Sequence, residues 1–191
     1  MKELVEAIRT QGVGVGDDIV KVDMFLNHRL DTELVVKMGQ AFAEAFADEK
    51  PDLVLTVEAS GIAAALTTAM ALGNLPVVFA KKSQTRNVTG DVYQSNVFSF
   101  THGVENHVRV SKNYLPVGSR VLVIDDFLAN GAAASGLCDI VHQASGTVVG
   151  VGVCVEKKFQ PGRAKLEGMG CRVVSLASVI GIDNGSQIVE D

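Results

Sequence analysis

Short, almost purely apolar segments alternate along this chain with longer segments whose apolar residues recur at helical spacing. Apolar runs of this kind are typical of strands that are covered on both faces of a sheet. The predicted strands span residues 53–57, 77–80, 120–124, 147–155 and 172–177. Because strands alternate with helices, the pattern predicts an α/β fold with a central parallel sheet flanked by helices.

The helices are predicted from apolar stripes that repeat every three to four residues. They span residues 1–11, 31–48, 61–72, 132–144 and 163–169. Asp31 suits the start of the second helix, because its carboxylate can accept a hydrogen bond from the first turn. The apolar stripe of that helix comprises Leu34, Met38, Phe42, Ala45 and Phe46. In the fourth strand, Gly150 and Gly152 leave room for close packing.

Composition is that of an ordinary globular protein, with 47% hydrophobic and 20% charged residues among 191. A chain of this length can bury a core without a metal or disulfide, so we expect a single domain over residues 1–191. The cysteines are Cys138, Cys154 and Cys171. Their spacing matches no metal site, and it indicates reduced core thiols of a cytoplasmic protein.

Nucleic acid and membrane are both disfavoured as partners. The balance of 17 basic and 22 acidic residues gives a net charge of −5, whereas a general nucleic-acid binder needs a basic face. The most apolar stretch, residues 61–80, is divided by a turn signal at 73–76 and is too short to span a bilayer. Residues 1–9 are mixed in charge and do not resemble a secretory signal. We therefore expect a soluble protein.

Two stretches depart from the alternating pattern. Residues 12–16 read Gly-Val-Gly-Val-Gly, which is a weak match to a dinucleotide-binding loop. No convincing strand precedes them, and Asp17 and Asp18 would repel a pyrophosphate, so we interpret them as a flexible turn. Residues 81–111 form the most polar stretch, and their few apolar residues predict a hairpin.

Chemistry is most clearly indicated in residues 121–133, where an apolar strand ends in Asp125 and Asp126 and a small-residue loop opens a helix. Ligands of open α/β sheets bind at the carboxyl ends of the strands. Two carboxylates there can accept hydrogen bonds from the vicinal hydroxyls of a sugar. Small loop residues let backbone N–H groups approach a phosphate at the helix N-terminus. The alternative is a simple junction whose acids only cap the helix.

These residues resemble the fingerprint of the type I phosphoribosyltransferases, which is an apolar strand, two acids and a phosphate loop of small residues. Residues 21–28, 125–131 and 156–163 are similar to the xanthine-specific members of that family. The resemblance extends from the first helix to about Ala177. There is one departure from the wider family, which has serine or threonine hydroxyls at two positions of this loop. In this sequence those positions carry Asn130 and Ala133.

The resemblance implies the type I phosphoribosyltransferase fold, with a flexible flap at about residues 83–111 and a small hood. The hood would consist of about residues 1–30 and the C-terminal part of the chain. The implied reaction transfers the phosphoribosyl group of 5-phosphoribosyl 1-diphosphate to xanthine, giving xanthosine 5′-monophosphate and diphosphate in purine salvage. The resemblance also implies a homodimer, and Mg²⁺ carried mainly by the diphosphate, with no metal site of the protein's own.

Site residues follow from the same resemblance. Asp125 and Asp126 would be the catalytic acids that hold the ribose hydroxyls. The residues that would bind 5-phosphoribosyl 1-diphosphate are Ala129, Asn130, Gly131, Ala132, Ala133, Ser60 and Lys81, with Lys82 beside them. Those that would bind xanthine are Val20, Asn27 and Lys157, of which Lys157 would donate to the 6-oxo group.

Several alternatives stay open at this stage. Ser60 could be an ordinary helix cap, and Lys81 and Lys82 a solvated strand end. Phe159 could either stack on the base or pack in the core. The same transferase could act on guanine, hypoxanthine or adenine. A regulator that binds 5-phosphoribosyl 1-diphosphate without catalysis is the alternative from a different class.

Overall fold

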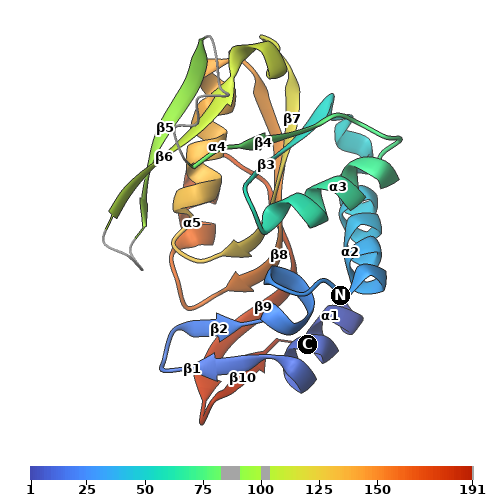
Figure 1. Ribbon diagram of the computed structural model, residues 1–191, viewed down its shortest axis with the longest axis vertical. Helices are drawn as coiled ribbons and strands as arrows, with labels where there is room; N and C mark the ends of the chain where they lie inside the picture. The colour runs from blue at the N-terminus through green and yellow to red at the C-terminus, as the bar shows by residue number, and fades with distance from the viewer. Residues whose placement is uncertain (83–90, 100–103, 191) are drawn as a thin grey trace.

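The computed structural model describes residues 1–82, 91–99 and 104–190. Within these ranges, a six-stranded sheet carries helices on both faces, and two separate hairpins flank it (Figure 1). The predicted α/β architecture is therefore confirmed. Part of the predicted flap, residues 83–90 and 100–103, lies outside the described residues.

The elements agree closely with the apolar pattern. The sheet consists of β3 (Leu53–Val57), β4 (Val77–Ala80), β7 (Arg120–Leu128), β8 (Thr147–Lys157), β9 (Val173–Asp183) and β10 (Ser186–Val189). The hairpins are β1 (Val13–Val15) with β2 (Ile19–Lys21), and β5 (Val92–Ser99) with β6 (Val104–Ser111). The helices are α1 (Lys2–Gln11), α2 (Thr32–Ala45), α3 (Gly61–Ala71), α4 (Ala132–Gln143) and α5 (Gly162–Gly168). Shorter helical turns are η1 (Asp23–Asn27), η2 (Ala47–Glu49) and η3 (Lys112–Tyr114).

The strand order of the large sheet is β10-β9-β8-β7-β3-β4. All neighbours in it are parallel except β10, which is antiparallel to β9. Strand β7 therefore lies in the middle of the sheet, between β8 and β3. Its carboxyl end meets those of its two neighbours, which is where open α/β sheets bind ligands.

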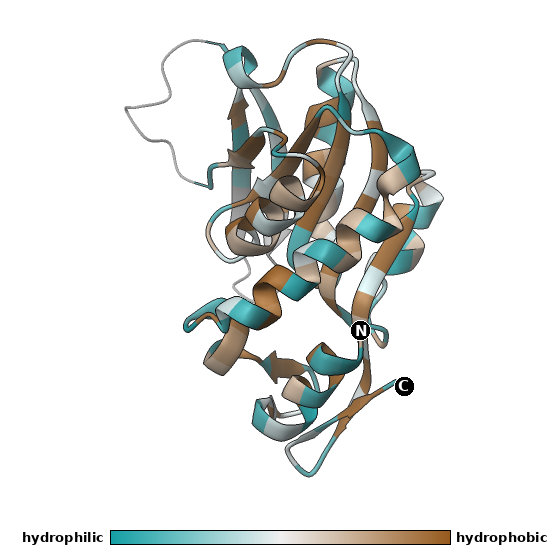
Figure 2. Ribbon diagram, turned by 90° about the vertical axis from the view of Figure 1, so that its right-hand side faces the viewer, coloured by the Kyte–Doolittle hydropathy of each residue, from teal (hydrophilic) through white to brown (hydrophobic). Residues whose placement is uncertain are grey.

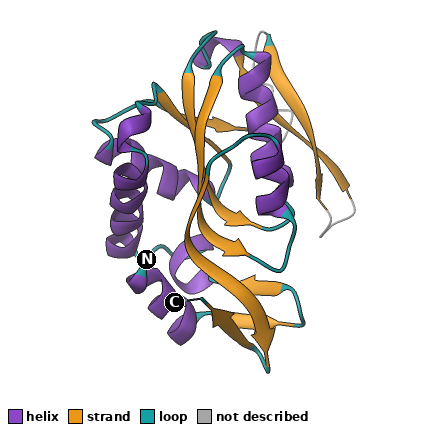
Figure 3. Cartoon of the chain, turned by 180° about the vertical axis from the view of Figure 1, so that it is seen from behind, coloured by secondary structure: helices purple, strands orange, loops and turns teal. Residues whose placement is uncertain are grey.

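Helices pack on both faces of the sheet (Figure 3), and the strands of the sheet are largely hydrophobic (Figure 2). Alternate residues of β7 point to opposite faces, as the pleat of a strand requires. Leu122 and Ile124 join a core with α1, α2 and α3, whereas Val121 and Val123 join a second core with α4, α5 and the β5–β6 hairpin. Asp31 caps α2 as predicted, because its Oδ1 accepts a hydrogen bond from Leu34 N–H at 3.1 Å.

Close packing at Gly150 leads to a prediction about stability. A Cβ atom on Gly150 would lie 2.3 Å from Cε1 of the buried Phe46 ring, so Gly150→Ala must displace that ring. Overpacking of this kind costs about 1–3 kcal/mol, and we expect that loss in the free energy of unfolding measured in urea. Gly168→Ala is the control, since a Cβ there meets nothing within 4 Å. Equal stability of the two variants would contradict the close contact.

Three predicted boundaries need correction. Residues 12–16 are not one flexible turn, because residues 13–15 form β1, which pairs with β2. Of the five residues, only Gly16 belongs to the turn between these strands, together with Asp17 and Asp18. The pairing of β7 with β8 carries β7 on to Leu128, so Asp125 and Asp126 lie within the strand rather than after it. The last predicted strand, residues 172–177, runs on to Asp183 and returns as β10.

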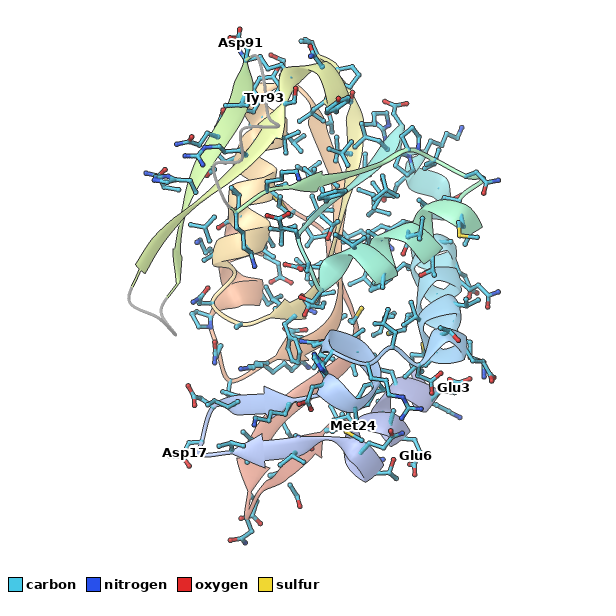
Figure 4. All side chains as sticks on the ribbon, viewed as in Figure 1. Glu3, Glu6, Asp17, Met24, Asp91 and Tyr93 are labelled. Atoms are coloured by element: carbon cyan, nitrogen blue, oxygen red, sulfur yellow. The ribbon has the colours of Figure 1, made fainter. Side chains whose placement is uncertain are left out.

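Both ends of the chain meet at one end of the sheet. The N–H of Gly14 in β1 donates to the Gly185 carbonyl at the β9–β10 turn over 2.8 Å, and Arg9 donates to the Val189 carbonyl. Asp17 lies at the tip of the β1–β2 hairpin, at the opposite end of the molecule from Asp91 and Tyr93 (Figure 4). In the described ranges, none of the helices combines the length and the apolar character needed to traverse a bilayer.

Candidate functional site

The acid pair lies at the carboxyl end of the central strand and is almost fully enclosed. Asp125 is 3% exposed and Asp126 is 8% exposed. The backbone N–H of Asp126 donates to Oδ1 of Asp125 over 3.0 Å. Neither acid caps α4: its cap residue is Gly131, and Asn130 Oδ1 accepts from Ala132 N–H at 2.9 Å. The capping alternative is therefore wrong, and the burial of two adjacent acids needs another reason.

Asp125 is held in an environment that favours its protonated form. Burial raises the pKa of Asp125 well above its ordinary value, and the neighbouring carboxyl of Asp126 raises it further. The backbone N–H of Asp126 and the cation of Lys82 lower the pKa, but they do not compensate for burial. A second positive charge, brought by a ligand, would stabilise the ionised pair in the same way as Lys82 does.

The N-terminus of α3 faces Asp125. A Cβ atom on Gly61 would lie 3.0 Å from Asp125 Oδ1 and 2.3 Å from Thr56 Oγ1, so only a glycine leaves these groups in place. The Thr56 hydroxyl is fully buried and has no hydrogen-bond partner among the described residues. Ser60 precedes the helix but its hydroxyl makes no cap bond, so the ordinary cap interpretation of Ser60 is not supported.

The end of β4 brings two lysines to the same edge of the sheet. Glu58 Oε1 accepts a hydrogen bond from Lys82 N–H at 2.9 Å, and Glu58 N–H donates to the Ala80 carbonyl at 3.1 Å. The loop before α3 is therefore tied to β4. Lys82 acts electrostatically on Asp125, whereas Nζ of Lys81 lies 5.5 Å from the centre of the Phe79 ring. Of the two lysines, Lys82 is therefore the one whose charge lowers the pKa of Asp125.

The predicted phosphate loop, residues 129–133, turns tightly between β7 and α4. Gly131 has a φ of +76°, which a residue with a side chain rarely adopts. A Cβ there would also lie 3.1 Å from Gly162 Cα. The N–H of Gly162 donates to the Ala129 carbonyl over 3.0 Å, so the start of α5 supports this loop. Ala132 and Ala133 form the first turn of α4, whose N-terminus suits an anion.

Lys157 connects the sheet to the β1–β2 hairpin. Its Nζ donates to the Asp18 carbonyl over 2.7 Å and lies 5.9 Å from the centre of the Phe127 ring. Burial lowers the pKa of Lys157, with the charge of Asp18 opposing that effect. Of the other two residues predicted to bind the base, Val20 is buried in β2 and Asn27 is exposed at the end of η1. Lys157 and the hairpin that carries Val20 are therefore brought together.

The β5–β6 hairpin is anchored beside this edge at two points. Arg109 of β6 exchanges backbone hydrogen bonds of 2.9 and 3.0 Å with Lys81. The amide of Gln143 on α4 donates to the Gln94 carbonyl of β5 over 2.8 Å. The described part of the predicted flap is thus fixed to both the β4 end and α4.

Sequence reasoning missed four residues of this region: Thr56, Phe127, Glu156 and Arg163. Glu156 is the informative omission, because an acid that ends an otherwise apolar strand is a signal of a buried partner. Phe159 is exposed, so the interpretation of Phe159 as a core residue is wrong.

The acid pair is compatible with a magnesium ion but offers it few ligands. Among the described residues, no group of three or more histidine, cysteine or acidic side chains gathers to hold a metal. Asp125 and Asp126 supply carboxylate oxygens, which Mg²⁺ accepts as ligands, but the remaining ligands must come from water and phosphate oxygens. The residues present therefore suit a metal that arrives with a phosphorylated ligand.

Comparisons with known proteins agree with this geometry. A model of the phosphoribosyl transferase domain matches residues 28–186. A xanthine phosphoribosyltransferase of Clostridioides difficile (strain 630) is 50% identical over 186 residues, covering 97% of this chain and 98% of that protein. One from Laribacter hongkongensis (strain HLHK9) is 51% identical over 184 residues, covering 96% and 97%.

Solved structures show the same fold at lower sequence identity. An adenine phosphoribosyltransferase from Rhodothermus marinus DSM 4252 superposes with a TM-score of 0.74 at 20% identity, covering 94% of this chain and 100% of that one. The enzyme of Saccharomyces cerevisiae, complexed with adenine and an imino-altritol bisphosphate, gives a TM-score of 0.72 at 23% identity, covering 92% and 99%. At these identities the likeness concerns the fold alone.

Proposed function

Because this chain belongs to the phosphoribosyl transferase family, we propose that it transfers the phosphoribosyl group of 5-phosphoribosyl 1-diphosphate to xanthine. The products are xanthosine 5′-monophosphate and diphosphate. The observation that carries this proposal is the buried acid pair near the end of β7, with the tight turn at Gly131 between that strand and the N-terminus of α4. Relatives that are half identical over nearly the whole chain support xanthine as the accepting base.

The acids act on the ribose. Departure of diphosphate builds positive charge on the sugar, and carboxylates that accept hydrogen bonds from its hydroxyls stabilise that charge. Protonation of Asp125 is favoured in the protein alone, because burial and the neighbouring acid raise its pKa. Approach of a cationic sugar favours the ionised form of Asp125, so the electrostatic interaction strengthens as the transition state forms.

Phosphate and diphosphate are held at neighbouring helix N-termini. Backbone N–H groups of residues 129–133, other than that of Ala132, and the side-chain amide nitrogen of Asn130 bind the 5′-phosphate, since Ala132 N–H already donates to Asn130 Oδ1 and this loop offers no hydroxyl at Ala133. Ser60 at the start of α3, with Lys82 and Lys81, faces the diphosphate. Mg²⁺ arriving with the diphosphate would supply charge neutralisation at the leaving group. No covalent nucleophile is needed, because positioning and electrostatics supply the acceleration.

Lys157 recognises the base. Its ammonium group has three donors, of which one serves the Asp18 carbonyl, so another can reach the 6-oxo group of a purine. Val20 contributes an apolar contact, and Asn27 offers both a donor and an acceptor to the other edge. The β1–β2 hairpin, η1 and the β9–β10 turn then form the hood over the base, with the β5–β6 hairpin in the flap. We further expect the homodimer and the cytoplasmic location of a salvage enzyme.

The deciding experiment is a diphosphate-release assay with xanthine, guanine, hypoxanthine and adenine at equal concentration, with and without Mg²⁺. We expect the highest turnover with xanthine, and a strong loss without Mg²⁺. Faster turnover with another base would reassign the substrate within the same transferase class. Release with none of the four bases, despite binding of 5-phosphoribosyl 1-diphosphate, would favour a non-catalytic regulator.

Base choice gives a prediction with a matched control. Lys157→Ala should lower kcat/KM for xanthine and for hypoxanthine together, because both bases carry the 6-oxo group. The loss should correspond to about 1–3 kcal/mol of transition-state stabilisation for each base. Asn27→Ala should mainly narrow the gap between the two bases, since only xanthine carries a second oxo group. Lys158→Ala is the control, because the Lys158 ammonium pairs with Glu190 rather than with Asp18. If Asn27→Ala lowers both bases equally, Asn27 does not read the second oxo group.

A further inference from the structure

An ion pair between Glu156 and Arg163 joins the two ends of the segment that connects Lys157 with the support of the phosphate loop. Glu156 directly precedes Lys157 in the sequence, and Arg163 directly follows Gly162 at the start of α5. The guanidinium of Arg163 grips the carboxylate of Glu156 with two parallel bonds, Nε to Oε1 at 2.7 Å and Nη2 to Oε2 at 2.6 Å. The residues between them, 157–162, are therefore held as a closed loop.

The Glu156 carboxylate is buried, whereas the Arg163 side chain is 31% exposed and also pairs with Glu167 at 3.2 Å. Glu156 is 1% exposed, and its Oε2 also accepts a hydrogen bond from the Ser175 hydroxyl on β9 at 2.7 Å. Arg163 further donates to the carbonyl of Val173 at 3.3 Å. Burial raises the pKa of Glu156, but hydrogen bonds from Arg163 and Ser175 outweigh that effect and hold the pKa below its ordinary value. The carboxylate therefore stays ionised in its buried position.

Each end of the closed loop contacts a different half of the site. At one end, Lys157 reaches the hairpin through the Asp18 carbonyl. At the other end, Gly162 donates to the Ala129 carbonyl and lies against Gly131 in the phosphate loop. Lys157 is the immediate neighbour of Glu156 and Gly162 is the immediate neighbour of Arg163. One ion pair thus sets the distance between the two contacts.

We infer that Glu156 and Arg163 are positioning residues that fix Lys157 and the phosphate loop relative to each other. This inference rests on the proposed function for the identity of the two ligands, a purine base at Lys157 and a phosphorylated sugar at residues 129–133. In this role Glu156 and Arg163 contact each other and Ser175 rather than the ligands. Glu156 and Arg163 set the spacing between Lys157 and the phosphate loop, so a weakened ion pair weakens the binding of both the base and the phosphorylated sugar.

The geometry of the pair favours this role over simple stabilisation. Burying an ion pair costs desolvation energy, and an apolar pair of similar volume often gives equal or greater stability. A planar fork on a carboxylate fixes orientation as well as distance, which an apolar contact does not. Arg172 offers the comparison: it holds Glu49 through one nitrogen at 2.9 Å rather than through a fork, donates its other bond to the Ala45 carbonyl at 3.0 Å, and is exposed.

The test compares Arg163→Lys and Arg163→Ala with the control Arg172→Ala. For Arg163→Ala, KM for xanthine and for 5-phosphoribosyl 1-diphosphate should both rise by on the order of 10-fold, with a smaller change in kcat. Arg163→Lys keeps the charge but not the two parallel hydrogen bonds. It should therefore fold, and both of its KM values should lie between those of the parent and of Arg163→Ala. Arg172→Ala should leave both KM values unchanged.

Amide hydrogen exchange supplies a readout that needs no activity. In Arg163→Ala, peptides covering residues 157–163 and residues 126–134 should both exchange faster, because Gly162 N–H loses its fixed acceptor at Ala129. A rise confined to one KM, or faster exchange confined to residues 157–163, would overturn the inference. If the parent chain transfers phosphoribose to no purine, the proposed function is wrong, and the exchange of the two peptides alone decides whether the pair couples them.

Discussion

Gly131→Val is expected to lower kcat/KM for 5-phosphoribosyl 1-diphosphate by on the order of 100-fold, mainly through a higher KM. Two features of Gly131 act together. Its φ of +76° excludes a β-branched residue, and its Cα faces the backbone of Gly162 so closely that a Cβ would lie 3.1 Å away. The loop must therefore open, which moves the N–H groups of residues 129–133 away from the phosphate.

Gly118→Val is the matched control, since Gly118 has a φ of +80° but a Cβ there meets nothing within 4 Å. It carries the same backbone strain far from the acid pair, so it should lose stability and keep its KM. Gly131→Ala provides a milder change should the valine variant fail to fold. Unchanged affinity for 5-phosphoribosyl 1-diphosphate in a folded Gly131 variant would remove this loop from the phosphate site.

Asp125→Asn is expected to lower kcat by on the order of 100-fold while stabilising the fold. The amide keeps the shape of the carboxyl but cannot stabilise a cationic sugar. An interaction made mainly in the transition state is lost from kcat more than from KM. Asp126→Asn should show the same separation of kcat from KM. Steady-state kinetics on both variants, with the exposed Asp48→Asn as control, measure this effect.

Stability should change in the opposite direction to activity. Because the folded protein holds the pKa of Asp125 above its unfolded value, the protonated form stabilises the fold at low pH. That stability is lost as the pH rises through the folded-state pKa. Urea unfolding of the parent across pH should show this decline, and Asp125→Asn should not. Normal turnover of both variants would make the acids merely structural. An identical pH dependence of unfolding in the parent and in Asp125→Asn would contradict the raised pKa of Asp125.

Local apolar pattern was sufficient to predict most of the sheet. Strands β3 and β4 have the predicted bounds because their residues, such as Leu55 and Val78, are apolar apart from Thr56 and are bounded by clear turns. Strand β7 is longer than predicted because its extension through Asp125 and Asp126 depends on a partner, β8, that lies elsewhere in the sequence. Pairing between distant segments is not visible in the periodicity of either one.

The candidate site was predictable in part for the same reason. Adjacent acids followed by small residues form a local motif, so Asp125, Asp126 and the loop after them could be singled out. The hydroxyl of Thr56 against Gly61, and the fork of Arg163 on Glu156, arise only when separate elements meet. Lys82 rather than Lys81 acts on Asp125 because of how β4 ends, which residue types alone do not reveal.

The meeting of the two chain ends has a consequence for the order in which the protein forms during synthesis. The α-amino group of Met1 donates to the Leu176 carbonyl, and Arg9 donates to the Val189 carbonyl, across 175 and 180 residues of sequence. On the ribosome the N-terminal residues emerge long before Leu176 and Val189. Strands β3, β4 and β7 can pair well before that. The sheet around the acid pair can therefore form while the chain is still growing, whereas α1 and the β1–β2 hairpin find their contacts only after β9 and β10 have emerged.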